Sequence, residues 1–276
     1  MLETVVNYVF MFFFFSAVGW TIECTYLSLG ERRVINSGFL HGPLCPIYGT
    51  GMIVLNICLV PLSQPAEKRF WLVILLGMVL ADTVEYMTSL LMEKLFHARW
   101  WDYSNNFLNL HGRICFKHTV YWAIFSVIYV YVIAPLYEFL LSFIPQNVRT
   151  ISVFVILAIF FVDLFITVKA AANIQNVMTK LEKLKQSALA LPETIKGTAD
   201  MFNEWKADAS AKYTEVKSQF EKLTDGERKE AYAKDTKRLL IMNAGLRKNV
   251  TKRMNEVERI VEEIKAKYKD DTYTGE

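Results

Sequence analysis

The chain has 276 residues and a formal net charge of +3, with 53% hydrophobic and 14% aromatic residues. These fractions are too high for an ordinary soluble domain of this size and favour a membrane protein. The net charge is too small to indicate nucleic acid as a partner, and we predict none. The four cysteines have neither CxxC pairing nor zinc-ligand spacing, so we predict no disulfide framework, no metal site and no cofactor.

The hydropathy pattern divides the chain near residue 172. Long apolar runs fill the first part, whereas Lys, Glu and Asp dominate from Asn173 onward. The first part contains 10 basic and 10 acidic residues and the second contains 21 and 18, so the small positive charge belongs to the second part. We predict a transmembrane domain over residues 1–172 and a cytoplasmic helical tail over residues 173–276.

Five stretches of the first part are long enough to cross a bilayer, whose core needs about 20 mostly apolar residues per helix. They cover residues 5–29, 39–62, 70–95, 119–144 and 148–169. Because backbone groups in lipid must be satisfied within their own segment, we expect these stretches to be helices. The predicted fold class is all-α: a polytopic membrane protein with about five transmembrane helices, followed by a C-terminal cytoplasmic amphipathic or coiled-coil domain.

Lys and Arg in the short connections predict the orientation of the spans. An external N-terminus puts Arg32, Arg33 and the Lys-rich tail on the cytoplasmic side, although Lys68 and Arg69 then lie outside. We therefore predict a multi-pass protein of the cell membrane with its N-terminus outside and its tail in the cytoplasm.

Several spans contain ionisable residues, each of which costs about 2.5–3.5 kcal/mol at the centre of a transmembrane helix. Glu23 lies in the last third of the first span, and Glu85 lies in the middle of the third. Glu85 is too deep to reach water by snorkelling, so we expect it to face a polar interior or an arginine. Glu138 lies near a span end, where contact with the interface explains it, and Asp163 lies within two turns of Lys169.

The run SGFLHGPLCPIYGTG, residues 37–51, interrupts the second span with glycines and prolines. Proline removes an amide donor and breaks helix continuity, and irregular backbone at membrane depth is tolerated only inside protein or beside a wet cavity. We predict that this run lines a cavity near the cytoplasmic face, with His41, Cys45 and Tyr48 as candidate lining residues. The alternative is a loose start of the second helix.

A second irregular run, RWWDYSNNFLNLHGRICF, covers residues 99–116. It contains more polar residues than an interfacial aromatic belt requires, and a re-entrant membrane element is one explanation. Arg113 follows a glycine, which suggests a turn that aims its guanidinium toward the membrane. Its partner is then Glu85, Asp102 or an anionic lipid headgroup. We expect the three histidines in and beside this run to be interfacial side chains without a catalytic role.

We hypothesise that polar residues from the spans and from both irregular runs meet in one shielded site near the cytoplasmic face. The candidates are Glu23, His41, Cys45, Tyr48, Glu85, Trp101, Asp102, Tyr103, Asn109 and Arg113. The sequence does not single out a catalytic residue among them.

These motifs, taken in order, resemble a known family. They are GWxxE (residues 19–23), GFLHGPLCPIYGTG (38–51), Glu85, WWDYS (100–104) and NLHGRIC (109–115). Together they are similar to the CmpB-like ABC transporter permeases, also called ABC-transporter type IV, over roughly residues 5–145. The resemblance implies a bacterial multi-pass membrane protein with a permease function. Such a permease needs a separate ATPase subunit, and this chain has no GxxxxGK[ST] motif of its own.

The resemblance leaves the tail unexplained. Apolar residues at helical spacing predict helices at about residues 171–190, 192–223 and 227–268, with a break at Leu191-Pro192. Stripes of this kind usually pack on one another or on a partner helix. We predict an antiparallel three-helix bundle or a coiled-coil hairpin, with a helical protein as a possible partner of the tail.

Three functions remain open. A permease would use the charged residues to line a path through the lipid bilayer, and its few spans would require a homodimer. A membrane-embedded enzyme acting on a lipid or lipid-linked substrate would use His41, Cys45, Glu85 or Asp102 for proton transfer or attack, with Arg113 holding a phosphate. A membrane-anchored scaffold would recruit its partner through the tail. The family resemblance favours the permease.

Overall fold

The computed structural model describes residues 1–32, 35–64, 66–97, 99–194, 207–208, 211–212, 214–215, 218 and 244–270. The chain forms two compact units. One contains residues 1–93 and 100–167, and the other contains residues 94–99 and 168–276. Each unit is described separately below, beginning with the membrane helices of the first.

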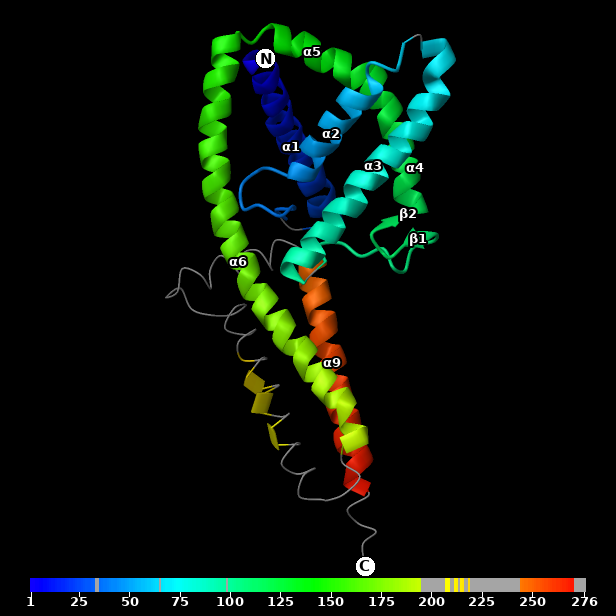
Figure 1. Ribbon diagram of the computed structural model, residues 1–276, viewed down its shortest axis with the longest axis vertical. Helices are drawn as coiled ribbons and strands as arrows, with labels where there is room; N and C mark the ends of the chain where they lie inside the picture. Colours follow the sequence, from blue (N-terminus) through cyan, green and yellow to red (C-terminus); the bar gives the residue numbers. More distant parts are fainter. Residues whose placement is uncertain are drawn as a thin grey trace, which may run out of the picture. The chain divides into compact units, whose positions relative to one another are not determined.

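Among the residues that the structure describes, four helices are long and apolar enough to cross a membrane (Figure 1). Their apolar segments cover Leu2–Gly30, Arg69–Phe96, Phe116–Ser142 and Gln146–Gln186. They belong to α1 (Leu2–Glu31), to α3 (Ala66–Phe96), to the continuous stretch α4–η1–α5, and to α6 (Gln146–Thr194). The chain is thus a mostly helical membrane protein.

The predicted span at residues 39–62 contains a shorter helix, α2 (Pro46–Leu59), of 14 residues. Pro46 occupies its first turn, where the missing amide donor costs nothing, and the preceding residues form bends rather than helix. A helix of this length reaches about 21 Å, whereas a bilayer core is about 30 Å thick. The prediction of a fifth span therefore stays a prediction.

Helices α1 and α2 pack closely because glycine lies at their crossing. A Cβ at Gly49 would overlap the Phe12 carbonyl oxygen and the Ser16 hydroxyl. A Cβ at Gly19 would likewise overlap the Tyr48 ring. Small residues at these positions let the two backbones approach, which is how helices gain packing energy in lipid.

A widened turn connects α4 (Phe116–Ile128) and α5 (Ala134–Ser142). This turn is the π-helical segment η1 (Tyr129–Ile133), in which the Ala134 amide donates to the Tyr129 carbonyl. Pro135 follows and has no amide of its own to donate, and prolines are a common cause of such irregularity. The fully buried Tyr129 packs in the hydrophobic core with Phe15 and Leu55, and its hydroxyl lies 3.3 Å from the Met52 carbonyl oxygen.

The irregular run between α3 and α4 forms a short hairpin rather than a helix. Strand β1 (Asn109–Leu110) pairs antiparallel with β2 (Ile114–Cys115). The turn between them contains His111 at φ 53° and Gly112 at φ 68°. Two successive left-handed residues reverse the chain tightly, so Arg113 emerges in a fixed direction.

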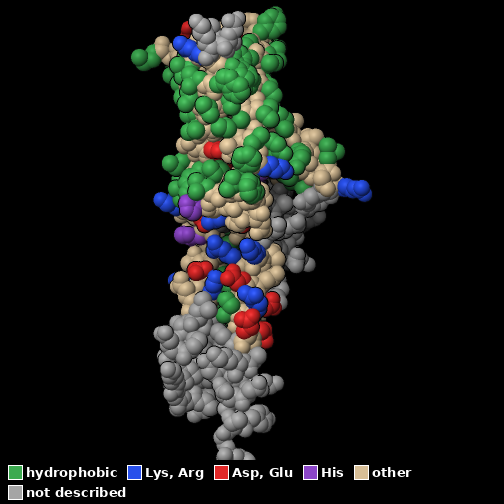
Figure 2. Space-filling model, turned by 90° about the vertical axis from the view of Figure 1, so that its right-hand side faces the viewer, with side chains coloured by type: hydrophobic (Ala, Val, Ile, Leu, Met, Phe, Trp, Pro, Cys, Tyr) green, Lys and Arg blue, Asp and Glu red, His purple; other side chains and the backbone are tan. Residues whose placement is uncertain are grey.

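The surface of the membrane helices is strongly apolar. On the face drawn in Figure 2, hydrophobic side chains cover most of the helical region, with few charged groups among them. On α6 the side chains of Phe154, Phe161 and Phe165 are each at least 60% exposed. Exposed apolar surface on this scale is unfavourable in water, so these faces contact lipid.

In the second unit, α6 continues through Thr194. The prediction of a helix break at Leu191-Pro192 is therefore wrong, since the helix assignment extends beyond Pro192. The helix predicted at residues 192–223 lies largely outside the described residues. The described part of the third predicted helix is α9 (Ala244–Asp270).

The part of α6 that belongs to the second unit and helix α9 lie side by side and run in the same direction (Figure 1). Each has a buried apolar stripe: Ala170, Ile174, Val177, Leu181 and Leu184 on α6, and Leu246, Val250, Val257 and Val261 on α9. Lys185 Nζ donates to Glu256 Oε1 at 2.7 Å beside these stripes. Steps of three and four residues place such side chains on one helical face.

The close approach of α1 and α2 can be tested with two glycines of the same helix. Gly49→Ala should lower the free energy of unfolding by about 1–3 kcal/mol, because its methyl group overlaps α1. Gly51→Ala is the control, since a Cβ there meets nothing within 4 Å and alanine favours the helix. Thermal unfolding in detergent compares them, and equal stability of the two variants would contradict the packing.

Candidate functional site

The Glu23 carboxylate of α1 is surrounded by residues of the first irregular run. The Ser37 hydroxyl donates to Glu23 Oε1, and the Cys45 thiol lies 3.7 Å from Oε2. The Tyr48 hydroxyl of α2 also forms a hydrogen bond with this carboxylate. Glu23 is thus held by three groups from residues 37–48, which fixes the run against α1.

A second carboxylate, Glu85 of α3, is only 6% exposed. Trp122 Nε1 donates to Glu85 Oε2 at 3.0 Å, and the Tyr103 hydroxyl also hydrogen-bonds to the same carboxylate. Its two donors come from opposite sides of the hairpin in sequence, one before it and one on α4. Glu85 therefore joins α3, α4 and the second irregular run.

Tyr103 connects the two carboxylates. Its hydroxyl hydrogen-bonds to Glu85 and interacts electrostatically with Glu23, and it also interacts with Tyr48. Burial, followed by the Glu85 carboxylate, raises the pKa of the Tyr103 hydroxyl well above its usual range. The hydroxyl therefore stays protonated and acts as a donor. We call Glu23, Tyr48, Glu85 and Tyr103 the carboxylate–tyrosine cluster.

Within the described ranges of the chain, no cationic side chain pairs with the carboxylate–tyrosine cluster. In the part of the chain that the structure describes, Asp163 faces the His41 ring and Glu93 faces Arg113, whereas neither Glu23 nor Glu85 has an ion-pair partner. Removing an ionised carboxylate from water without a partner charge is costly, and hydrogen bonds offset only part of this cost. The cluster is therefore suited to accept a proton or another cation.

The cluster belongs to a longer polar stripe on α3. Asp82, Glu85, Tyr86, Ser89 and Glu93 follow one another at helical steps, so they share one face. Most meet a partner from the hairpin or from α4: Thr119 donates to Asp82 at 2.7 Å, and the Tyr86 hydroxyl lies 3.1 Å from His111 Nδ1. The polar face of α3 thus points away from lipid.

Arg113 finds a partner that the sequence analysis did not consider. Its Nη2 donates to Glu93 Oε2 at 2.6 Å, and its guanidinium carbon lies 5.5 Å from the centroid of the Tyr86 ring. Neither Glu85 nor Asp102, the protein partners expected for Arg113, makes this ion pair. The reason is geometric: the hairpin delivers the guanidinium to α3 about two turns beyond Glu85.

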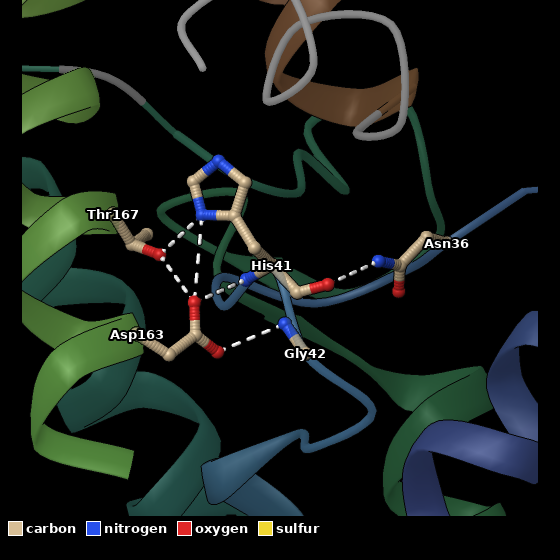
Figure 3. Close-up of polar contacts among 5 residues, drawn as sticks. All are labelled: Asn36, His41, Gly42, Asp163 and Thr167. Carbon is tan, nitrogen blue, oxygen red and sulfur yellow. Dashed lines mark hydrogen bonds and ion pairs between the residues drawn. The ribbon is translucent and has the colours of Figure 1, made fainter. Parts of the chain in front are cut away.

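His41 lies in a separate group of contacts (Figure 3). Its backbone amide and that of Gly42 donate to the two oxygens of Asp163 on α6, at 3.1 and 2.8 Å. Its ring Nδ1 lies 2.6 Å from the Thr167 hydroxyl and 3.6 Å from Asp163. Asn36 Nδ2 donates to the His41 carbonyl oxygen at 2.8 Å. Asp163 thus fastens the first irregular run to α6.

The remaining predicted residues hold the second irregular run in shape. Trp101 Nε1 donates to the Arg113 carbonyl oxygen at 3.0 Å. Asp102 accepts the Ser104 amide at 3.0 Å, and Asn109 Oδ1 accepts the Gly112 amide at 3.0 Å. These contacts close turns within residues 101–113. They place Tyr103 against Glu85 indirectly, through the backbone.

Several contributing residues were absent from the predicted set: Ser37, Glu93, Trp122, Asp163 and Thr167. Glu93 carried a usable signal, because it continues the polar stripe of α3 by helical steps from Glu85. Asp163 was assigned to the neighbourhood of Lys169. Asp163 accepts hydrogen bonds from the backbone amides of residues 41 and 42. The pattern of side chains in the sequence could not predict these contacts, because every residue except proline has a backbone amide.

Another pair lies beside the cluster. The Cys115 sulfur lies 3.1 Å from His118 Nδ1, and the His118 ring stacks on Tyr103 with a centroid separation of 4.3 Å. Cys115 immediately precedes the first residue of α4, and Asn106 Nδ2 lies 3.4 Å from its sulfur. A thiol beside an imidazole is the arrangement that nucleophilic catalysis uses.

The link between Asp163 and the first irregular run can be tested separately from function. Asp163→Asn leaves one acceptor oxygen and turns an amide donor toward a backbone N–H, so it should destabilise the chain by about 1–3 kcal/mol. Glu138→Gln, at an exposed position, is the matched control and should have little effect. Thermal unfolding in detergent measures both, and equal transition temperatures would refute the fastening role.

Comparison with known proteins gives one match. The family model described as "Putative ABC-transporter type IV" matches residues 10–168, which is more than half of the chain. The matched residues include α1 from residue 10 onward, both irregular runs, and α6 up to the turn that contains Asp163 and Thr167. Comparison with curated proteins and with solved structures gave no match.

Proposed function

Because the chain belongs to the putative ABC-transporter type IV family, we propose that it is the membrane component of a transport system whose solute binds at the carboxylate–tyrosine cluster. The proposed solute carries a positive charge, such as a protonated amine. Glu23 and Glu85 supply the negative charge, and Tyr48 and Tyr103 orient the two carboxylates.

One observation carries this proposal. Two carboxylates from different membrane helices each hydrogen-bond to a buried tyrosine, and in the described residues neither carboxylate has an ion-pair partner. Ionisable groups inside membrane domains commonly mark ion or substrate pathways because their burial is costly. A bound cationic solute would supply the missing positive charge and so offset the free-energy cost of burying the carboxylates. After the solute is released, that cost would return.

The proposal extends to partners and topology. ATP hydrolysis would come from a separate ATPase subunit, since the sequence contains no GxxxxGK[ST] motif. A homodimer would provide enough helices to enclose a path, and a helical protein could bind the charged tail. We also retain the orientation that the Lys and Arg distribution favours, with five spans, the N-terminus outside and the tail in the cytoplasm.

Transport can be tested without knowing the solute. Cells expressing the full chain would be compared with cells lacking it for accumulation or release of a panel of radiolabelled amines, amino acids and organic anions. Glu23→Gln and Glu85→Gln should each reduce chain-dependent movement of at least one cation about tenfold or more, by loss of a charged hydrogen-bonding group. Glu138→Gln, at an exposed position, should leave it unchanged.

Expression levels in the membrane fraction control for folding of each variant. Movement of the cation at the wild-type rate in both glutamate variants would reject the cluster as the solute site. Chain-dependent movement of anions alone would reject the proposed solute class.

A membrane enzyme acting on a lipid or lipid-linked substrate is the second candidate, favoured by the contact between Cys115 and His118. Cys115→Ser should then abolish conversion of a labelled lipid extract by the purified chain, and His118→Gln should slow it strongly, because the thiol loses its base. Thin-layer chromatography of the extract measures both. Cys58→Ser, at a free cysteine on α2, is the control, and conversion that survives Cys115→Ser would exclude the thiol mechanism.

A further inference from the structure

Arg113 has hydrogen-bonding capacity that the protein does not use. The residue is only 8% exposed, and its Nη2 donates to Glu93 at 2.6 Å. Its Nε and Nη1 are buried and have no hydrogen-bond partner within the described part of the chain. Donors of a charged group are rarely left buried and unpaired, because the loss of their hydration is not compensated.

The guanidinium is held in place from several directions. The Arg113 amide donates to the Leu110 carbonyl oxygen at 3.0 Å, and Trp101 donates to the Arg113 carbonyl oxygen at 3.0 Å. The side chain lies over the Tyr86 ring, and Glu93 fixes one end of the fork. The guanidinium is therefore pre-organised, so little of the binding free energy of an acceptor is spent on ordering this side chain.

The position of this group along α3 indicates which acceptor is available. Glu93 lies three residues before Phe96, where the apolar segment of α3 ends. The end of a membrane span lies near the lipid headgroups, whose phosphate oxygens are strong acceptors for arginine. A carboxylate partner is already present in Glu93, so the unused donors call for a second oxyanion.

We propose that Arg113 forms a phosphate-binding site at the end of the α3 span. Its ligand is a phosphate oxyanion, supplied either by a lipid headgroup or by a soluble phosphate. The site is distinct from the carboxylate–tyrosine cluster, which attracts cations, and it does not depend on the proposed transport function. Because the unused donors of Arg113 are buried, ligand binding requires the hairpin to move aside.

The test uses the full chain purified in a phosphate-free neutral detergent. Tryptophan fluorescence would follow thermal unfolding during titration with inorganic phosphate at constant ionic strength. A second titration would compare phosphatidylglycerol with diacylglycerol of the same acyl chains in mixed micelles. A phosphate site predicts a rise in transition temperature. A rise with inorganic phosphate identifies a soluble ligand, and a rise with phosphatidylglycerol but not with inorganic phosphate or diacylglycerol identifies a headgroup.

Variants assign the effect to Arg113. Arg113→Gln should raise the half-maximal concentration of the active ligand about tenfold or more, because a charged donor is lost. Arg113→Lys keeps the charge opposite Glu93 but loses the planar fork, so it should fold and bind with intermediate strength. Glu93→Gln still accepts from Nη2 but removes the competing charge, and it should tighten binding.

Arg149 provides the matched control. It is another partly buried arginine whose Nη1 donates to Asn7 at 2.9 Å and whose Nε has no hydrogen-bond partner in the described residues. Arg149→Lys should leave the phosphate effect unchanged. The proposal is overturned if neither titration raises the transition temperature of the wild-type chain, or if the Arg113 variants respond as the wild type does. Weaker binding by Glu93→Gln would also overturn it.

Discussion

Hydrocarbon offers no hydrogen bonds, so every polar group that these helices bury must find its partner in the protein itself. This constraint explains which segments of the membrane unit contact one another through polar groups. The Glu85 carboxylate is reached by Trp122 from α4 and by Tyr103 from the hairpin region, and Asp163 is reached by two backbone amides. Each buried acid therefore ties one membrane helix to an irregular segment.

The two irregular runs do the connecting because regular helices cannot. In a helix the backbone amides already donate to the preceding turn, so they cannot serve an acid on another helix. The prolines at residues 43 and 46 keep the first run out of helical form, which leaves the amides of His41 and Gly42 free to donate to Asp163. In the second run, left-handed residues at His111 and Gly112 turn Arg113 toward Glu93. The irregular backbone segments thus decide which membrane helices are joined to one another.

Charge is distributed unevenly among these contacts. Asp163 and Glu93 each face a basic side chain, whereas Glu23 and Glu85 face hydroxyl, thiol and indole donors. Arg113 in turn has more donors than Glu93 can occupy. An excess of negative charge at one place and of unused donors at another is unusual in a purely structural core, because each raises the free energy of the folded state. Under the two proposals, a cation at the carboxylate–tyrosine cluster and an oxyanion at Arg113 would lower both costs.

The sequence by itself determined that the chain is a membrane protein, because such long apolar runs are stable in lipid but unfavourable when exposed to water. It also indicated the family, through motifs that keep their order. It singled out Glu23, Glu85 and the two irregular runs as candidates, because polar groups and prolines are conspicuous in apolar surroundings. Only the tertiary structure decided the partners. Asp163 meets His41 across 122 positions of sequence, and Arg113 meets Glu93 rather than the acids proposed for it. A side chain's type sets what it needs, but its direction and its neighbours depend on how helices cross and where a turn ends.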